Sequence, residues 1–225
     1  MSVIAASGSR AFGSSIPPEI LSKMQKGIMR TDYRGAKFSK CPFDVLLYIQ
    51  LIERLKPRSV IEIGTKEGGS ALWLADTVSA YGYCVPKVIA VDISLERLKV
   101  KDERITFIEG DALNLGGVLK AETLATLPRP WLVIEDSAHL FETSTAVLNF
   151  FDAHLQPGDY IVVEDGILAD IQMVEERFTM FQNRPNRAVA HFLANNEGKY
   201  QIDEELCDYY GYNVTYSPNG WLRRL

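Results

Sequence analysis

Two short acidic strings each follow an apolar run of the chain, EDSAH at Glu135–His139 and EDG at Glu164–Gly166. The runs are typical of strands, and side chains at the carboxyl ends of parallel strands face the crevice in which open α/β sheets bind ligands. Asp136, Glu164 and Asp165 supply only oxygen donors, which suit Mg²⁺ and not zinc, although Mn²⁺ or Ca²⁺ could substitute. We therefore predict a metal site made by these three carboxylates.

His139 follows Asp136 by three positions, within reach of an oxygen held on such a metal. A divalent ion would relieve the repulsion between the carboxylates and could chelate vicinal hydroxyls of a substrate, lowering the pKa of one of them. The neutral imidazole would then accept the proton. His139 and Asp136 are the predicted catalytic residues, with Glu135 outside the site. The structural alternatives are a helix cap at Asp136 or Ser137 and an ordinary hydrogen-bonded histidine.

A glycine-rich turn lies upstream, between the apolar run Val60–Ile63 and a helical pattern that begins at Ala71. Glycines there let the backbone approach a ligand, and a helix amino terminus offers free N–H groups. Lys66 stands where the dinucleotide fingerprint needs its second glycine, which disfavours a pyrophosphate. With an acid after the second strand, suited to ribose hydroxyls, and Gly-Asp-Ala after the third, the succession resembles the S-adenosylmethionine site of class I methyltransferases. The predicted cofactor residues, each of which could instead be only a turn residue, are Glu62, Gly64, Thr65, Gly68, Gly69, Ser70, Asp92, Asp111 and Ala112.

Apolar runs separated by helix-length segments predict an α/β fold with a mostly parallel sheet. The five runs are Val60–Ile63, Val88–Ile93, Ile105–Ile108, Trp131–Ile134 and Tyr160–Val163. Helices are predicted from Phe43 to Leu55, before Pro57, and roughly from Ile167 to Phe181. Three later runs are short and strand-like, and the last two are expected to form an antiparallel edge hairpin with a tight turn: Lys199–Ile202, Asn213–Tyr216 and Trp221–Arg224.

The composition gives no footprint for nucleic acid or an anionic membrane surface, because 24 basic residues against 29 acidic ones leave a net charge of −5. A small-molecule substrate is expected. Three scattered cysteines, a polar start and the lack of roughly 20 successive apolar residues favour a cytoplasmic protein without a disulfide framework or membrane anchor. We divide the chain into a flexible segment at 1–40 and one domain at 41–225.

The chain resembles the cephalosporin hydroxylase and rhamnosyl O-methyltransferase family of class I S-adenosylmethionine-dependent methyltransferases, and more distantly the metal-dependent macrolide-sugar O-methyltransferases. The most specific element is Asp-x-x-His followed by Glu-Asp; the other matching segments are Cys41–Asp44, Ile61–Ser70 and Ser217–Arg224. The resemblance implies a Rossmann-like fold with a mostly parallel seven-stranded sheet and an antiparallel C-terminal edge hairpin. It implies S-adenosylmethionine below the strand ends, Mg²⁺ on Asp136, Glu164 and Asp165, and a base at His139. It also implies a homo-oligomer, in which the segment 1–40 would be a lid or a subunit contact.

The leading functional hypothesis is Mg²⁺-dependent transfer of the methyl group of S-adenosylmethionine to a hydroxyl of a sugar or other small natural product. An alternative is a non-catalytic S-adenosylmethionine-binding accessory protein of a biosynthetic oxygenase system, and the glycine spacing disfavours a nicotinamide oxidoreductase. Hydroxylase chemistry has no support, because the sequence offers no iron triad, haem ligand or flavin motif. A basic and aromatic stretch could close over the bound molecules or be a solvated connector: Tyr33, Arg34, Lys37, Phe38 and Lys40.

Overall fold

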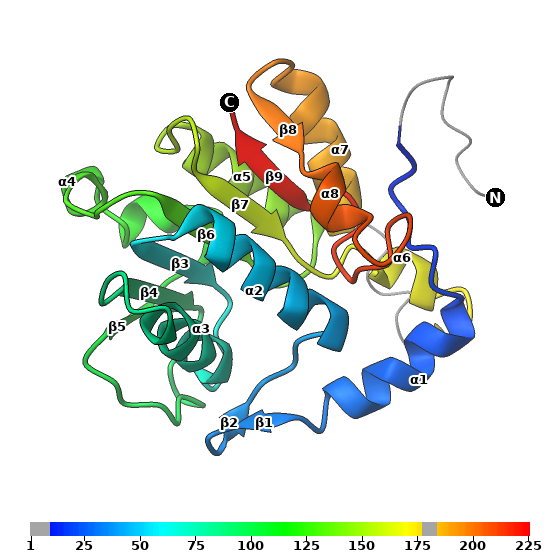
Figure 1. Cartoon of the computed structure of the whole chain (residues 1–225), viewed down its shortest axis with the longest axis horizontal. Coiled ribbons are helices and arrows are strands. Elements are labelled where there is room, and N and C mark those ends of the chain that lie inside the picture. The colour runs from blue at the N-terminus through cyan, green and yellow to red at the C-terminus, as the bar shows by residue number, and fades with distance from the viewer. Residues whose placement is uncertain (1–9, 177–183) are drawn as a thin grey trace.

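The main sheet of the computed structural model confirms the predicted fold class (Figure 1). The structure describes residues 10–176 and 184–225. The strands of the main sheet are β3 (Ser59–Ile63), β4 (Lys87–Asp92), β5 (Ile105–Glu109), β6 (Trp131–Glu135), β7 (Tyr160–Val163), β8 (Tyr200–Ile202) and β9 (Trp221–Arg224). Within these residues the seven strands lie in the order β5-β4-β3-β6-β7-β9-β8. Only β9 is antiparallel to its neighbours β7 and β8, whereas the other pairs are parallel.

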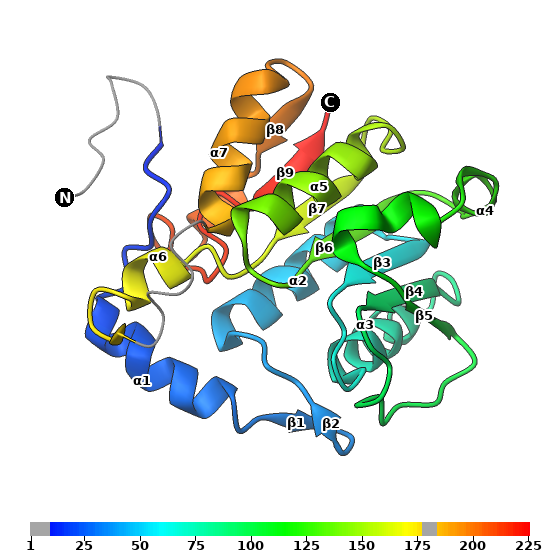
Figure 2. The same cartoon turned by 180° about the vertical axis from the view of Figure 1, so that it is seen from behind.

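Helices cover both faces of this sheet, as Figures 1 and 2 show from opposite sides. The elements are α2 (Pro42–Leu55) and α3 (Gly69–Ala80) on one face, and the 3₁₀ helix η1 (Ala112–Gly117), α4 (Ala121–Ala125), α5 (Phe141–Asp152) and α7 (Pro185–Asn195) on the other. Successive strand residues point to opposite faces. Val60 and Leu132 accordingly pack with α2 and α3, whereas Ile61 and Val133 pack with α5 and α7.

Helix α2 confirms the helix predicted from Phe43 to Leu55 and leads the chain into the sheet. Pro42 occupies its first turn, where a missing N–H costs nothing. Lys56 closes it in the left-handed conformation with φ of 51°, and its N–H donates to the Ile52 carbonyl before Pro57 stops the helix. The predicted strand at Val60–Ile63 follows at once as β3, all of whose residues are buried.

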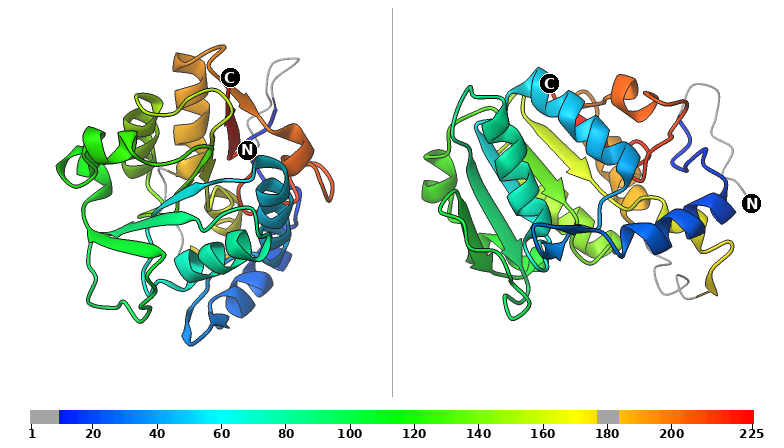
Figure 3. Two further views of the ribbon diagram at one scale, coloured as in Figure 1. Left: turned by 60° about the vertical axis from the view of Figure 1, so that its left-hand side comes forward. Right: turned by 60° about the horizontal axis from the view of Figure 1, so that its bottom comes forward.

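The N-terminal segment from residue 10 to 40 carries helix α1 (Pro18–Ile28) and a small hairpin, β1 (Asp32–Tyr33) and β2 (Ala36–Lys37). Figure 3 shows α1 and the hairpin along one end of the main sheet. Leu21 and Ile28 of α1 are buried in a small apolar cluster that also contains Ile171, the last residue of α6 (Leu168–Ile171). The role of the N-terminal segment as a lid or subunit contact stays a prediction.

Two predicted elements near the C-terminus differ in the structure. The segment Asn213–Tyr216 is a loop and not a strand, and the antiparallel partner of β9 is β8, which is followed by the short helix α8 (Glu204–Cys207). Asn213 has φ of 50°, a left-handed conformation that a strand does not accept. Of the helix expected at Ile167–Phe181 the structure shows α6, and residues 177–183 lie outside the described part.

Candidate active site

Strand register brings the two acidic strings together at the carboxyl edge of the sheet. Ile63 of β3 pairs with Glu135 of β6, which in turn pairs with Val163 of β7. Backbone hydrogen bonds also hold the residues that follow these strands side by side. The Asp136 N–H donates to the Ile63 carbonyl at 2.8 Å, and the Glu164 N–H donates to the Glu135 carbonyl at 2.9 Å. The prediction that both strings face one crevice therefore follows from backbone pairing.

The glycine-rich turn touches the acidic loop directly. Gly64 has φ of 96°, and a Cβ placed on it would lie 2.0 Å from the Asp136 carbonyl oxygen. A Cβ on Gly69 would lie 2.2 Å from the carbonyl oxygen of Lys37, in the N-terminal hairpin. Only glycine allows these approaches. The hairpin is also attached by the Lys37 N–H, which donates to the Glu67 carboxylate at 2.9 Å.

Two acids after the next strands shape the same crevice. Asp92, at the end of β4, accepts hydrogen bonds on Oδ2 from the backbone N–H groups of Thr65 and Lys66 at 2.9 and 2.6 Å. It therefore orders the glycine turn through one carboxylate oxygen. Asp111 follows β5 and caps η1 by accepting from the Leu113 N–H.

A cavity of about 600 Å³ joins the turn to the acidic strings. Six of the nine predicted cofactor residues line it: Gly64, Thr65, Ser70, Asp92, Asp111 and Ala112. Glu62, Gly68 and Gly69 do not line it within the described part of the chain. Asp136, His139 and Asp165 line the same cavity, so the glycine turn and the acidic strings face one space.

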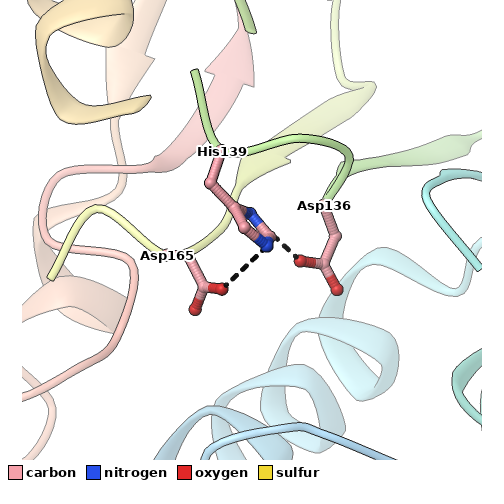
Figure 4. Close-up of side chains that lie close together, drawn as sticks. All are labelled: Asp136, His139 and Asp165. Atoms are coloured by element: carbon pink, nitrogen blue, oxygen red, sulfur yellow. Dashed lines mark ion pairs between the residues drawn. The ribbon is translucent and has the colours of Figure 1, made fainter. Parts of the chain in front are cut away.

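Asp136, His139 and Asp165 form one cluster, with the imidazole between the two carboxylates (Figure 4). One candidate ligand atom of each lies within 4.8 Å of the others. His139 Nε2 is 3.5 Å from Asp165 Oδ2, and Nδ1 is 3.8 Å from Asp136 Oδ1. His139 and Asp165 both have φ of 56°, a strained backbone conformation that is common at functional sites.

A comparison with known protein families places the chain. The family model described as Rhamnosyl O-methyltransferase/CmcI matches residues 25–225. The chain belongs to this family. The predicted family and the predicted enzyme class, an S-adenosylmethionine-dependent O-methyltransferase, are confirmed.

Curated relatives agree with this membership, and a solved structure shares the fold. The rhamnosyl O-methyltransferase of Mycobacterium leprae (strain TN) is 30% identical over 200 residues, covering 86% of this chain and 83% of its own. That of Mycobacterium tuberculosis (strain ATCC 25618 / H37Rv) is 28% identical over 199 residues, covering 87% and 78%. A CmcI structure with Mg and S-adenosylmethionine shares the fold at a TM-score of 0.65, with 24% identity over 88% of this chain and 77% of that one.

Burial controls the ionisation of the acids in this methyltransferase. Burial raises the pKa of Asp136 and of Asp165, and the Lys40 ammonium and His139 offset only part of this effect. For His139, burial lowers the pKa, but the carboxylates of Asp165 and Asp136 more than compensate, so that its pKa is raised. Burial raises the pKa of Glu135 to about 7, even though its carboxylate accepts hydrogen bonds from Ser137 and Ser144. Glu135 does not line the cavity within the described residues.

Glu164 lies apart from the His139 cluster. Its Oε1 accepts from Lys40 Nζ at 2.7 Å and from the Tyr48 hydroxyl. It is not part of the candidate cluster among the described residues, whereas His139, predicted as a base, is. Its role as a metal ligand stays a prediction.

Several residues that line the cavity were not among the predicted site residues. They include Gln25 of α1, Met29 directly after that helix, and Lys40 in the connection between β2 and α2. The basic and aromatic stretch drew attention to Lys40 without distinguishing it from Lys37. No local signal in the sequence indicates that its side chain points inward. No helix in residues 10–176 and 184–225 has the length and apolar character needed to cross a bilayer.

Proposed function

We propose that this methyltransferase moves the methyl group of S-adenosylmethionine to a hydroxyl of a sugar, such as a rhamnosyl group, or of another small natural product, with Mg²⁺ at the acidic cluster. The observation that supports this most is the single cavity lined by both the glycine turn and the cluster of Asp136, His139 and Asp165. Curated relatives carry the name rhamnosyl O-methyltransferase, which favours a sugar acceptor and disfavours the non-catalytic accessory role.

The residues present fit both groups. Gly64, Thr65 and Ser70 of the turn line the cavity, which extends past Asp92 to Asp111 and Ala112 and so offers space for a cofactor against the turn. The carboxylates of Asp136, Asp165 and Glu164 supply oxygen donors, which suit Mg²⁺ or Mn²⁺. We propose Asp136 and Asp165 as ligands, with Glu164 as the third. When bound, the metal supplies a Lewis acid that lowers the pKa of an acceptor hydroxyl.

The protein groups then divide the chemistry between them. His139, held between two carboxylates that favour its protonated form, accepts the proton of the acceptor hydroxyl as the oxygen attacks the methyl carbon. Asp165 and Asp136 orient the imidazole and stabilise the imidazolium. Leu168, Gln25 of α1 and Met29 directly after that helix line the same cavity. We propose this helix as a lid that sets acceptor specificity.

The metal mechanism is tested with Asp136→Asn and with chelator. The reaction is followed as S-adenosylhomocysteine release with rhamnosides and other deoxysugars as acceptors. The variant should lose at least about 10²-fold in kcat, because it loses a ligand and the partner of His139. Asp152→Asn, which breaks an ion pair with Lys199 away from the cavity, is the control and should stay active. Full activity of Asp136→Asn in chelator would refute the metal-dependent mechanism.

The oligomeric state of the protein and its location in the cell stay predictions. The exposed aromatic side chains Tyr209, Tyr210 and Tyr212 lie on the loop after α8 and are candidates for a homo-oligomer contact. Analytical ultracentrifugation of the full chain tests this expectation. A cytoplasmic location and the absence of a nucleic-acid partner rest on composition alone.

A further inference from the structure

The ammonium of Lys40 lies among three carboxylates, of which Glu62 and Glu164 are buried and Asp136 is partly buried. Its Nζ is 2.7 Å from Asp136 Oδ2, 2.7 Å from Glu164 Oε1 and 3.8 Å from Glu62 Oε1, and its side chain is only 2% exposed. Neither carboxylate oxygen of Glu62 has a hydrogen-bond partner among the described residues. A lysine this deeply buried is rare unless it is paired. Lys40 is therefore a counter-charge for the acidic centre.

The surroundings of Lys40 hold it in this position. Phe38, two residues earlier, is buried against Trp73 with ring centroids 5.3 Å apart, and Cys41 is buried immediately after it. The Tyr48 hydroxyl of α2 donates to the same Glu164 oxygen as Lys40. Because Phe38 and Cys41 are both anchored in the core, the backbone at Lys40 is held beside the acidic centre.

We propose that Lys40 is a positioning residue of the acidic centre, a built-in monovalent cation that holds Asp136 Oδ2 and Glu164 Oε1 and thereby limits how tightly a divalent ion binds beside His139 and Asp165. The inference rests on the proposed metal site. It adds that the affinity of this site is held low by a charge from the N-terminal segment.

The direction in which metal affinity changes when Lys40 is replaced distinguishes this role from a packing role. A divalent ion bound on the Oδ1 side of Asp136 lies a few ångströms from the ammonium, so the two cations repel each other. At an effective dielectric constant near 20, removing this repulsion is worth more than about tenfold in affinity. A lysine that served only as packing would have the opposite effect, because its loss would disorder the ligands and weaken metal binding.

The experiment measures Mn²⁺ affinity of the full chain by titration calorimetry and electron paramagnetic resonance. Lys40→Met removes the charge at similar length, and Lys40→Gln removes it while keeping a hydrogen-bond donor for the carboxylates, which protects the fold. Lys99→Met is the control, since Lys99 pairs with Glu67 at 2.9 Å and its side chain is 55% exposed. Circular dichroism and the thermal midpoint with and without Mn²⁺ accompany each titration.

We expect both Lys40 variants to bind Mn²⁺ about tenfold or more tightly than the wild type, with a larger rise of the thermal midpoint on adding the ion. The control should stay within about twofold, because an exposed charge is screened. Equal or weaker binding by folded Lys40 variants, while the wild type binds, overturns the inference and leaves the metal site standing. If the Lys40 variants bind Mn²⁺ and the wild type does not, the inference is supported and the Mg²⁺ dependence of the wild type is refuted. If neither the wild type nor the variants bind Mn²⁺, the inference and the proposed metal site are both overturned.

Discussion

The contact between Gly64 and the Asp136 backbone makes a strong prediction about Gly64→Ala. Its added Cβ would lie 2.0 Å from the Asp136 carbonyl oxygen and 2.8 Å from Ser137 Cα. An ordinary carbon-to-oxygen contact is about 3.3–3.6 Å, so the acidic loop must move by more than about 1 Å. A displacement of that size at reacting groups costs about 10²-fold in turnover. The positive φ of 96° adds about 1–2 kcal/mol of strain.

A substitution at a second glycine distinguishes the effect of backbone strain from the effect of displacing the acidic loop. Gly82 has φ of 70°, and a Cβ there would have nothing within 4 Å. Gly82→Ala should therefore lose about 1–2 kcal/mol of stability and keep its activity. Both variants are compared by urea unfolding, S-adenosylhomocysteine calorimetry and kcat for methyl transfer. If Gly64→Ala retained turnover within about threefold of Gly82→Ala, the reasoning that this contact aligns the cofactor turn with the acidic loop would be wrong.

Three further predictions concern separate parts of the molecule. Burial raises the pKa of Asp44 to about 7, so the contribution of its protonated form to stability is full below pH 4 and is lost as the pH rises through 7. In urea unfolding, the free energy of unfolding of Asp44→Asn should exceed that of the wild type by up to about 4 kcal/mol at pH 8, but not at pH 4. A difference that does not change with pH would contradict this. Met29→Ala should raise the acceptor KM by about tenfold and leave S-adenosylhomocysteine affinity unchanged in calorimetry; a change in cofactor affinity alone would refute the lid. Asp92→Asn should weaken S-adenosylhomocysteine binding by about tenfold, because the N–H groups of Thr65 and Lys66 lose a charged acceptor; unchanged affinity would remove Asp92 from the cofactor site.

Much of the fold could be predicted because its signals are local. The apolar runs at Val60–Ile63 and Trp131–Ile134 belong to strands buried on both faces, and the carboxyl ends of neighbouring parallel strands meet. The position of Asp136 beside the glycine turn follows from that rule. Lys40 could not be placed in this way, since its partners Asp136 and Glu164 lie 96 and 124 positions away. No local pattern distinguishes an inward lysine from an exposed one.

The C-terminal loop was mispredicted for a related reason. The alternation at Asn213–Tyr216 is typical of a strand, but distant side chains satisfy its backbone and hydroxyl groups. The Thr215 hydroxyl and the Tyr216 N–H both donate to buried Asp44 of α2. Arg10 donates to Asn219 at 2.8 Å in the same loop. These side-chain contacts replace the backbone hydrogen bonds that a strand would make to a neighbouring strand.

The position of β9 between β7 and β8 fixes the order in which the sheet can be completed. Strand β8 pairs with β9 and not with β7, so residues 200–202 can join the sheet only together with residues 221–224 or after them. The sheet therefore stays incomplete beyond β7 until β9, the last of these strands in the chain, has docked. Until then the outer edge of β7 is an unpaired template for another chain. Refolding at high protein concentration should lose material at this step, and a free peptide with the sequence of β9 should slow the recovery of native protein by occupying that edge.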